Sequence, residues 1–525
     1  MDHSALTSDP PPAPGRRQRN RRSGRTRSRQ RQSGLNTTAT TPQRRQVPAY
    51  GLLHEEALRR LEDQADWILR EIGVEFHEDN DALRLFHAAG ADVQGCRVRF
   101  EPGHVRSLCA TAPSEFRLHG RNPQRTVTLG GDHVVLMPGY GSPFVTDLDR
   151  GRRYATLEDF NAFVKLTWLS PWLHHSGGTV CEPLDVPVNK RHLDMVYGHL
   201  RYSDKPFMGS VTAPERARDS LAMAELVFGK AFIDRHAVIQ ANINVNSPLV
   251  YDGVMSQVLR TYAAANQCVA VSPAIFGGAM GPVSQPAVIA QTLAEGMVGI
   301  ALTQLVKPGC PAVFGSFHST MNLKSGALTF GTPEANLTTM ALAQLGRRLG
   351  VPTRAGGGQI TASNAPDGQA MQDSTSAMWA ALLSGSHQVW HAAGWLEGGL
   401  TMSYEKFIMD LDNCGMMLTM LQGLAVNDDS LARDAYREAG PGQAFLSTSH
   451  TMVHYASANY QSLLPETGPY ETWSERGAPT AAERANGIWK TMLSDDQLPD
   501  IDPAVDDALK DYVARRKSEM TDEWY

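Results

Sequence analysis

Short strand-like runs alternate with helical patterns through the middle of the chain, and this alternation limits the possible folds more than any other feature. Helical periodicity separates the runs, for example at 214–228, 256–266, 287–306 and 333–349. Alternating strands and helices predict a parallel sheet covered by helices. The runs that we interpret as strands are 173–180, 206–211, 237–245, 268–276, 311–317, 353–358 and 388–393.

Seven such units in series, with 134–137 as a candidate eighth strand, favour an α/β fold of the TIM (β/α)8 barrel type. An open doubly wound sheet stays as the alternative, because the closure of a sheet leaves no mark in a sequence. In a barrel the reaction site lies at the carboxyl ends of the strands, so residues at these ends are the first candidates for function.

The region before these units predicts a small α/β cap. Apolar residues recur every three or four positions from Leu53 to Ile72, and Gly73 follows as a stop signal. Further helical patterns and β-like runs follow at 78–89, 97–100, 102–111 and 126–129. We therefore expect a disordered tail at 1–48, an N-terminal α/β cap at 49–131, the barrel at 132–425 and a mainly helical C-terminal segment at 426–525, which ends in a surface helix at 503–517.

The tail differs from the rest in charge. The first 45 residues hold eleven arginines and only Asp2 and Asp9 as acids, a net charge of +9, which leaves −15 for the remaining chain. Without apolar periodicity this segment should not fold alone. No aromatic residue lies among the arginines, which weakens the case for nucleic acid. We expect either a docking arm for an acidic partner protein or a solvated tail.

Cysteine usage and hydropathy bear on location. The six cysteines have no CxxC or CxxH spacing, and no apolar signal sequence is visible at the start, so we expect a reduced, cytoplasmic protein. The most apolar long stretch, 287–306, contains Gln291, Glu295 and Gln304. A membrane span needs about 20 mostly apolar residues, so this stretch predicts a buried helix.

The predicted strand at 237–245 and the residue after it carry a ladder of polar residues. The two-residue period places Gln240, Asn242, Asn244 and Asn246 on one face. A buried parallel strand is normally apolar throughout, so these side chains need partners. The ladder is either an internal hydrogen-bond network or a polar wall that reaches a ligand.

Unusual residues also follow the last predicted strands. His391, Trp395, Glu397 and Glu405 combine a ring that can exchange a proton, an aromatic face and two carboxylates, which suits a cationic ligand. The structural alternative is that Trp395 belongs to the core and that Glu405 pairs with Lys406 or a neighbour. A weaker chemical alternative is a hydrolase that uses His391 and Glu397 as acid and base.

Metal and nucleotide signals are weak. His174 and His175 precede Cys181 and Glu182, but adjacent histidines on a strand point to opposite faces, so we expect no metal site. The glycines at 356–358 permit close approach of a bound group, yet the GxxxxGK[ST] pattern is absent. Neither a GxSxG elbow nor an HExxH pair occurs.

Four long motifs carry a family resemblance. They are ALRRLEDQADWILREIGVEF at 57–76, GGGQITASNAPDGQ at 356–369, HAAGWLEGGLTMSYEK at 391–406 and GPGQAFLSTSHTMVH at 440–454. With these motifs and the Arg-rich leader, the chain resembles the trimethylamine methyltransferase superfamily. The resemblance is to its non-pyrrolysine branch, which includes glycine betaine:corrinoid protein methyltransferases.

The resemblance implies a TIM barrel that moves a methyl group from an N-methyl compound to the cobalt of a corrinoid (cobalamin) carried by a separate small protein. It implies no metal held by the barrel. In the trimethylamine enzymes pyrrolysine lies in the loop that aligns with 356–359, whereas this chain has only glycines and Gln359 there. That departure favours a quaternary amine such as glycine betaine, carnitine or proline betaine. The alternatives are trimethylamine or another N-methyl compound as donor, and a barrel that binds betaines or a corrinoid protein without catalysis.

The resemblance and the residues at the strand ends together predict which residues form the site. We predict that His391 and Glu397 are catalytic. We also expect a small corrinoid protein as partner, association into a homo-oligomer, and no membrane or nucleic acid. The predicted substrate-binding residues are Tyr140, Asn242, Asn244, Asn246, Phe317, His318, Gly357, Gly358 and Trp395.

Overall fold

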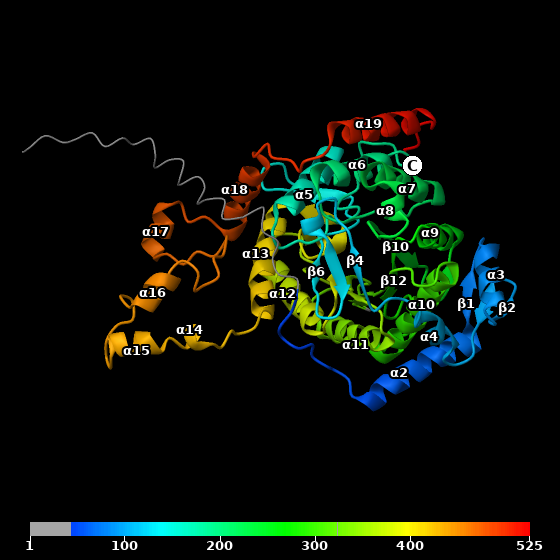
Figure 1. Ribbon diagram of the computed structural model, residues 1–525, viewed down its shortest axis with the longest axis horizontal. Helices are drawn as coiled ribbons and strands as arrows, with labels where there is room; N and C mark the ends of the chain where they lie inside the picture. Colours follow the sequence, from blue (N-terminus) through cyan, green and yellow to red (C-terminus); the bar gives the residue numbers. More distant parts are fainter. Residues whose placement is uncertain (1–43, 323, 525) are drawn as a thin grey trace, which may run out of the picture.

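A computed structural model describes residues 44–322 and 324–524 (Figure 1), so the predicted tail lies almost wholly outside the described residues. The molecule is a mixed α/β protein around one main sheet. Seven strands of this sheet are parallel and pair in the order β9-β10-β12-β13-β16-β17-β6. They are β6 (Val135–Leu136), β9 (Phe207–Met208), β10 (Ile239–Val245), β12 (Cys268–Phe276), β13 (Ala312–Gly315), β16 (Thr353–Ala355) and β17 (Gln388–Val389).

These strands lie within the ranges predicted from the sequence, although most are shorter than predicted. The strand at 268–276 has its predicted bounds. The predicted strands at 206–211 and 388–393 shrink to β9 and β17. At the end of β17 the chain turns, because His391 adopts a left-handed backbone with φ 56°. Two further strands, β14 (Phe317–Met321) and β15 (Leu328–Thr329), extend the sheet from the end of β12.

The predicted strand at 173–180 is wrong as a regular strand. Its geometry breaks where the His175 ring accepts a hydrogen bond from the Gly177 amide and where Gly177 takes φ 88°. Its backbone nevertheless bonds to both edges of the parallel sheet. The His174 amide donates to the Leu136 carbonyl at 2.9 Å, and the Met208 amide donates to the Gly177 carbonyl at 2.8 Å.

The sheet curls enough to bring distant strands together inside. Gln240 on β10 and Gln388 on β17 are separated by three strands in the sheet order. Their side-chain amides nevertheless exchange two hydrogen bonds of 2.9 and 2.8 Å. The Trp390 indole donates to the same Gln388 oxygen at 2.9 Å. This polar layer lies in the interior and satisfies its own donors and acceptors.

Helices cover the outside of the curled sheet (Figure 1). Two of them, at Pro214–Phe228 and Pro333–Leu349, have the bounds predicted from the sequence. Each begins at a proline, which is tolerated in the first helical turn. The covering helices are α5 (Leu157–Leu169), α6 (Arg191–Tyr202), α7 (Pro214–Phe228), α9 (Gly253–Ala264), α10 (Gln285–Val306), α11 (Pro333–Leu349), α12 (Gly368–Leu383) and α13 (Tyr404–Leu421).

Helix α10 is the one described helix long and apolar enough to cross a membrane by length and composition. In its most apolar window, however, 94% of the residues are buried inside the protein. Gln291, Glu295 and Gln304, which interrupt this window, are buried as well. A core helix has this environment, and the prediction of a buried helix is confirmed.

The N-terminal part packs on helix α10, which covers one side of the main sheet. Helix α2 (Glu55–Trp67) continues into a π-helical turn, and Gly73 ends it as expected. A small sheet, in which β1 (Val74–Phe76) lies between β3 and β11, connects this part to the main body. The connection is β11 (Val250–Tyr251), which pairs in parallel with β1 and belongs to the segment after β10. The other elements here are β2 (Asp92–Gln94), β3 (Arg97–Arg99), α3 (Asn80–Ala88) and α4 (His104–Cys109).

A hairpin of β4 (Glu115–Leu118) and β5 (Val127–Gly130) covers the amino ends of the parallel strands. Leu118, Val127 and Leu129 of the hairpin are fully buried in one apolar cluster with residues from the beginnings of β10, β12 and β13. A second small sheet stands at the opposite end. Its strands are β7 (Phe144–Thr146), β8 (Arg153–Tyr154), β18 (Trp395–Leu396) and β19 (Thr401–Ser403).

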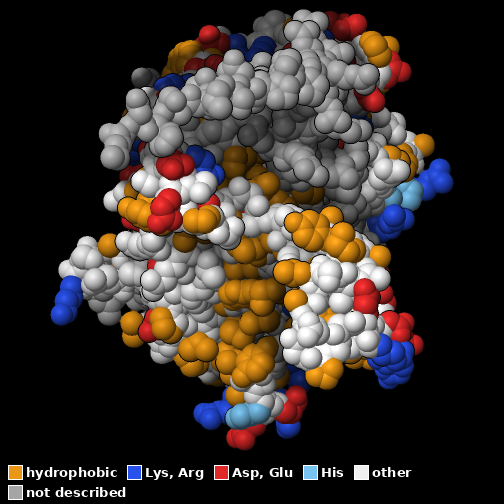
Figure 2. Space-filling model, turned by 90° about the vertical axis from the view of Figure 1, so that its left-hand side faces the viewer, with side chains coloured by type: hydrophobic (Ala, Val, Ile, Leu, Met, Phe, Trp, Pro, Cys, Tyr) orange, Lys and Arg blue, Asp and Glu red, His pale blue; other side chains and the backbone are white. Residues whose placement is uncertain are grey.

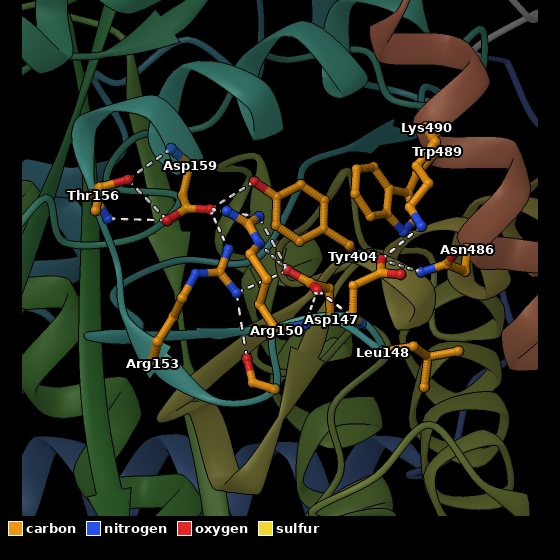
Figure 3. Close-up of polar contacts among 12 residues, drawn as sticks. Asp147, Leu148, Arg150, Arg153, Thr156, Asp159, Tyr404, Asn486, Trp489 and Lys490 are labelled. Carbon is orange, nitrogen blue, oxygen red and sulfur yellow. Dashed lines mark hydrogen bonds and ion pairs between the residues drawn. The ribbon is translucent and has the colours of Figure 1, made fainter.

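The C-terminal region contains two kinds of helix. Helix α18 (Ala481–Leu493) packs on α13 and α5, where Trp489 and Asn486 donate to the Glu405 carboxylate (Figure 3). Helix α19 (Pro503–Ser518) packs on α6 and α7 and confirms the helix predicted at 503–517. By contrast, four short helices form an arm with almost no buried side chains. They are α14 (Asp428–Leu431), α15 (Arg433–Ala439), α16 (Ser449–His454) and α17 (Tyr470–Glu475).

Hydrophobic side chains gather on the face of the molecule that carries this arm (Figure 2). Leu424, Leu446 and Tyr455 are each about four-fifths exposed or more, at 89%, 79% and 80%. The arm therefore contributes little to the core.

Candidate functional site

Four rings form an aromatic cluster at the carboxyl end of the parallel sheet: Phe317, Phe330, His391 and Trp395. The His391 and Trp395 rings stack with centroids 4.2 Å apart. Phe317 lies 5.7 Å from the His391 ring and 5.6 Å from the Trp395 ring, and Phe330 lies 5.6 Å from Trp395. The cluster thus brings together three predicted site residues. Aromatic faces arranged in this way suit a cationic ligand.

Backbone geometry positions the two stacked rings. His391 follows β17 with φ 56°, a conformation that histidine adopts more readily than most residues. Gly399 lies directly against the Trp395 indole, where a β-carbon would come within 2.2 Å of the ring. Any larger residue at 399 would push Trp395 out of its stack.

His391 is a neutral ring in this setting. It is 5% exposed, and burial together with the nearby Arg354 guanidinium lowers its pKa well below the usual range. Its Nε2 lies 3.3 Å from Nη2 of Arg354. A guanidinium can only donate, so Nε2 must accept and the ring proton must be on Nδ1. Nδ1 has no hydrogen-bond partner in the described part of the chain.

Arg354, on β16, is the charged residue beside the aromatic cluster. Its side chain is buried, and its Nη1 donates to the Ser316 carbonyl at 2.8 Å. The guanidinium carbon lies 4.1 Å from the centroid of the Trp390 ring and 5.9 Å from that of Phe317. Burial lowers the Arg354 pKa to about 9. Among the described residues no aspartate or glutamate forms an ion pair with it, and its Nε has no partner.

The polar ladder on β10 divides into two parts. Gln240 is fully buried in the amide pair with Gln388, as the network interpretation predicts. Asn242 is buried one step further along the same face, and Asn244 and Asn246 are exposed at the rim. The ladder therefore leads from a closed polar layer in the interior to the open end of the sheet.

Tyr140 and His318 lie near the same end. Burial raises the pKa of Tyr140, whose ring centroid lies 6.2 Å from that of Trp390. Tyr140 also lines a cavity of about 230 Å³ beside β9 and α6. His318 follows Phe317 on β14 and lines another cavity, of about 400 Å³, beside α11. Burial lowers the His318 pKa to about 3, so its ring is neutral as well.

The sequence profile of the family described as trimethylamine methyltransferase (MTTB) matches residues 17–521, which is most of the chain. The chain belongs to this family. The family resemblance seen in the sequence motifs is thereby confirmed.

Three curated relatives of this MTTB family protein act on quaternary amines by name. The glycine betaine methyltransferase of Desulfitobacterium hafniense is 40% identical over 478 residues, covering 91% of this chain and 99% of that protein. The proline betaine:corrinoid methyltransferase of Eubacterium limosum is 28% identical and covers 88% and 95%. The L-carnitine:corrinoid methyltransferase of the same organism is 26% identical and covers 85% and 92%.

In this MTTB family protein the glycine loop after β16 serves close packing. A β-carbon on Gly358 would lie 2.3 Å from the Trp390 carbonyl, and one on Gly357 would lie 2.6 Å from the Ile360 side chain. The Gln359 side chain points to α13, where it donates to the Asp410 carbonyl and accepts from Asn413. Gly358 thus lets the loop approach the chain just after β17, and Gly357 leaves room for the Ile360 side chain.

The two glutamates near Trp395 have partners of their own. Glu397 accepts two hydrogen bonds from Arg152, at 2.8 and 3.1 Å, and these bonds help to lower its pKa against the effect of burial. The structural alternative for Glu405 named Lys406 or a neighbour as its partner, and the structure gives it neighbours other than Lys406. Glu405 accepts from Asn486 and Trp489, while Lys406 pairs with Asp410 at 2.5 Å. Lys406 is one helical turn from Asp410, which gives that pair the better reach.

The weak metal signal at 174–182 has a structural explanation. His174 accepts from the Leu136 amide and His175 from the Gly177 amide, each through Nδ1. Within the described ranges, two groups have metal-like spacing, Glu75/His77/Cys96 and Asp429/His450/His454, and neither contains a residue of the aromatic cluster.

Sequence reasoning missed Arg354. The available signal was a single charged residue inside an otherwise uncharged predicted strand, 353–358. A buried strand rarely holds an unpaired charge, so Arg354 was as strong a candidate for a site residue as the asparagines of β10.

Proposed function

We propose that the protein transfers a methyl group from a quaternary amine, glycine betaine or a similar compound, to a corrinoid carried by a separate small protein. The observation that carries this proposal is the 40% identity with a glycine betaine methyltransferase over 99% of that protein's length. The names of the proline betaine and carnitine relatives support the same class of substrate.

The aromatic cluster supports a role in holding the ammonium group. Contact between a quaternary ammonium and an aromatic face contributes about 0.5–2 kcal/mol. Trp395 and Phe317, with ring centroids 5.6 Å apart and tilted by 50°, offer two such faces to one cation. In this proposal the cluster fixes the N-methyl group in the direction of the exposed rim formed by Asn244 and Asn246.

The protonation state of the site suits a quaternary substrate. Cobalt(I) of the corrinoid supplies the nucleophile that takes the methyl group. The amine then leaves as a neutral tertiary amine, which needs no proton. His391 is neutral and Glu397 is occupied by Arg152, so neither is held ready as an acid. We therefore propose that His391 positions the substrate rather than transferring a proton. Glu397 stays in the proposed site only as a residue that lines it.

We further propose that the main sheet is a closed (β/α)8 barrel. The segment 173–178 would be its eighth strand, because its backbone bonds to β6 on one side and β9 on the other. The Gln240–Gln388 pair across the interior supports closure. In this scheme 49–131 is the N-terminal cap, 132–425 the barrel and 426–525 the C-terminal segment.

The same proposal includes a cytoplasmic, homo-oligomeric enzyme. The six cysteines are unpaired in the described part of the chain, and all but Cys96 are buried, which suits a reducing compartment. The role of the Arg-rich tail as a docking arm for the corrinoid protein is part of this proposal.

The decisive experiment combines purified protein with chemically reduced cobalamin and a panel of amines. The panel contains glycine betaine, proline betaine, carnitine and trimethylamine. Formation of methyl-cobalt is followed by absorbance, and the demethylated product is identified by mass spectrometry.

Dimethylglycine formed from glycine betaine in step with methyl-cobalt is the expected result. If trimethylamine is the only amine of the panel that is turned over, the proposed quaternary substrate is wrong and the substrate is the tertiary amine. Binding of betaine without any turnover, also when the corrinoid protein is supplied, would reduce the protein to a binding module.

A further inference from the structure

We propose that Arg354 binds the carboxylate of the substrate and thereby restricts the enzyme to zwitterionic betaines, excluding methylated cations that lack a carboxylate. This inference rests on the proposed function and extends it from the ammonium to the opposite end of the substrate.

The first argument is the missing counter-charge. A buried charge is costly unless it is paired and hydrogen-bonded. Arg354 is 4% exposed, and its contacts in the described chain are neutral: a carbonyl, an imidazole and two aromatic faces. Two other buried arginines have acids, Arg125 with Asp204 and Arg191 with Glu182. An anionic ligand would supply what the chain does not.

The second argument is the kind of polar atom left without a partner. Three buried N–H groups around the aromatic cluster have no acceptor among the described residues: Nε of Arg354, Nδ1 of His391 and Nε1 of Trp395. All three are donors, because the contact with Arg354 places the His391 proton on Nδ1. A ligand that meets them must accept hydrogen bonds, as a carboxylate does.

The third argument is the orientation of the guanidinium. Nη1 is anchored on the Ser316 carbonyl, Nη2 faces His391, and the plane rests against Trp390. These contacts hold the group in one orientation and leave the Nε–H unused. Nε and the second N–H of a neighbouring nitrogen form the fork that binds a carboxylate through two hydrogen bonds.

The fourth argument is the short span between the two charges. The guanidinium carbon lies 5.9 Å from the Phe317 centroid, and the Phe317 ring belongs to the cluster assigned to the ammonium. In glycine betaine one methylene separates the ammonium from the carboxylate. A small zwitterion can therefore contact Arg354 and the aromatic cluster together, with each charge meeting its complement.

Specificity follows from the cost of leaving Arg354 unpaired. A site built to pair a substrate group rejects an analogue without that group far more strongly than an apolar pocket rejects an extra methylene. Choline keeps the trimethylammonium group but has a hydroxyl where glycine betaine has a carboxylate. We expect choline to be used at least about 1000-fold less efficiently than glycine betaine, measured as kcat/KM.

The test uses the full chain and three variants. Arg354→Gln removes the charge, and Arg354→Lys keeps the charge but loses the planar fork. Arg59→Gln is the matched control, because Arg59 is an exposed arginine of α2 that pairs with Glu55. Binding of glycine betaine and of choline is measured by calorimetry without cobalamin, and methyl transfer is measured with reduced cobalamin. Circular dichroism confirms that each variant is folded.

Wild-type protein and Arg59→Gln should bind glycine betaine alike and bind choline at least 100-fold more weakly. Arg354→Gln should lose at least 100-fold in betaine affinity, and Arg354→Lys should recover only part of it. The proposal is overturned if choline and betaine bind equally, or if folded Arg354→Gln binds betaine as the wild type does.

Calorimetry and turnover separate this proposal from the proposed function. Arg354-dependent betaine binding without methyl transfer would keep the carboxylate site and reject the methyltransferase activity. If the Arg354 variants transfer the methyl group of betaine as fast as the wild type, the methyltransferase activity is kept and the carboxylate site is rejected.

Discussion

Arginines lie in two regions of the molecule whose electrostatic surroundings differ. Near α5, Arg150 and Arg153 share Asp147 and Asp159 in an arginine–aspartate network that also reaches Tyr404 (Figure 3). At the carboxyl end of the sheet, Arg354 contacts only neutral groups of the described chain. In the first region every arginine is paired with an aspartate, so its charges stabilise the fold without a ligand. The second region is incomplete, so its charge serves binding.

The largest effect should come from breaking the network. Asp159 is 3% exposed and accepts hydrogen bonds from Arg153, Thr156 and Tyr404. Asp159→Asn removes a buried carboxylate that accepts hydrogen bonds from a charged group and two hydroxyl groups, which should lower the free energy of unfolding by about 3 kcal/mol in urea titrations. The control is Asp149→Asn, which removes an exposed partner of Lys490 and should change little. Equal stability of both variants would mean that the network does not hold the fold.

Acid should weaken the Arg354 region next. The pKa of His318 is lowered to about 3 and that of His391 well below its ordinary value, by burial and by Arg354. Between pH 6.5 and pH 3 His318 is protonated in the unfolded chain but stays neutral in the native protein. The free energy of unfolding therefore falls as the pH falls. At pH 5 the loss is about 2 kcal/mol for such an imidazole.

Urea titrations at pH 7, 6 and 5 measure this loss. His318→Gln should show a shallower fall in the free energy of unfolding than the wild type, by up to about 1.4 kcal/mol for each pH unit. Parallel curves for the two proteins would show that His318 does not titrate in the predicted way.

A smaller effect is expected from the aromatic side of the site. Trp395→Leu removes one face from the proposed ammonium contact, which is a loss of about 0.5–2 kcal/mol. KM for glycine betaine should rise between about two- and thirty-fold, with a smaller change in kcat. Trp395→Phe keeps an aromatic face and should lie between the wild type and the leucine variant. An unchanged KM in the leucine variant would remove Trp395 from the ammonium site.

The smallest effect on stability should come from Arg354 itself. Because Arg354→Met removes a buried charge that no acid of the described chain compensates, the free energy of unfolding should change by about 1 kcal/mol or less, and upward. This is the opposite of the result expected for Asp159→Asn, although both changes alter buried charge. A loss of several kcal/mol in Arg354→Met would place Arg354 among the structural arginines and erase the contrast.

Local signals predicted much of the fold. The bounds of α7 and α11 follow from a proline at the first turn and a glycine after the last, and both signals are visible in the sequence. The strand order follows from the series of βα units. The prediction of a regular strand at 173–180 was wrong because the side chains of His174 and His175 accept hydrogen bonds from backbone amides. Such side-chain bonds compete with the regular strand pairing, and a hydrophobic pattern does not reveal them.

The site was predicted less completely. Phe317, His391 and Trp395 follow strand ends and meet in the cluster, as their positions suggested. Arg354 and Phe330 were missed, because Arg354 meets His391 across 37 positions of the chain and Phe330 meets Trp395 across 65, and both contacts depend on how the strands are arranged in space. The role of Glu397 was equally invisible, because its partner Arg152 lies 245 positions away.

The left-handed backbone of His391 restricts how this site can change over evolutionary time. At φ 56°, asparagine, aspartate and glycine fit with little strain, whereas valine, isoleucine and threonine do not. A lineage can therefore exchange the imidazole for a short polar side chain, or lose it, while the end of β17 keeps its shape. It cannot replace His391 with a branched apolar residue without first rebuilding that turn.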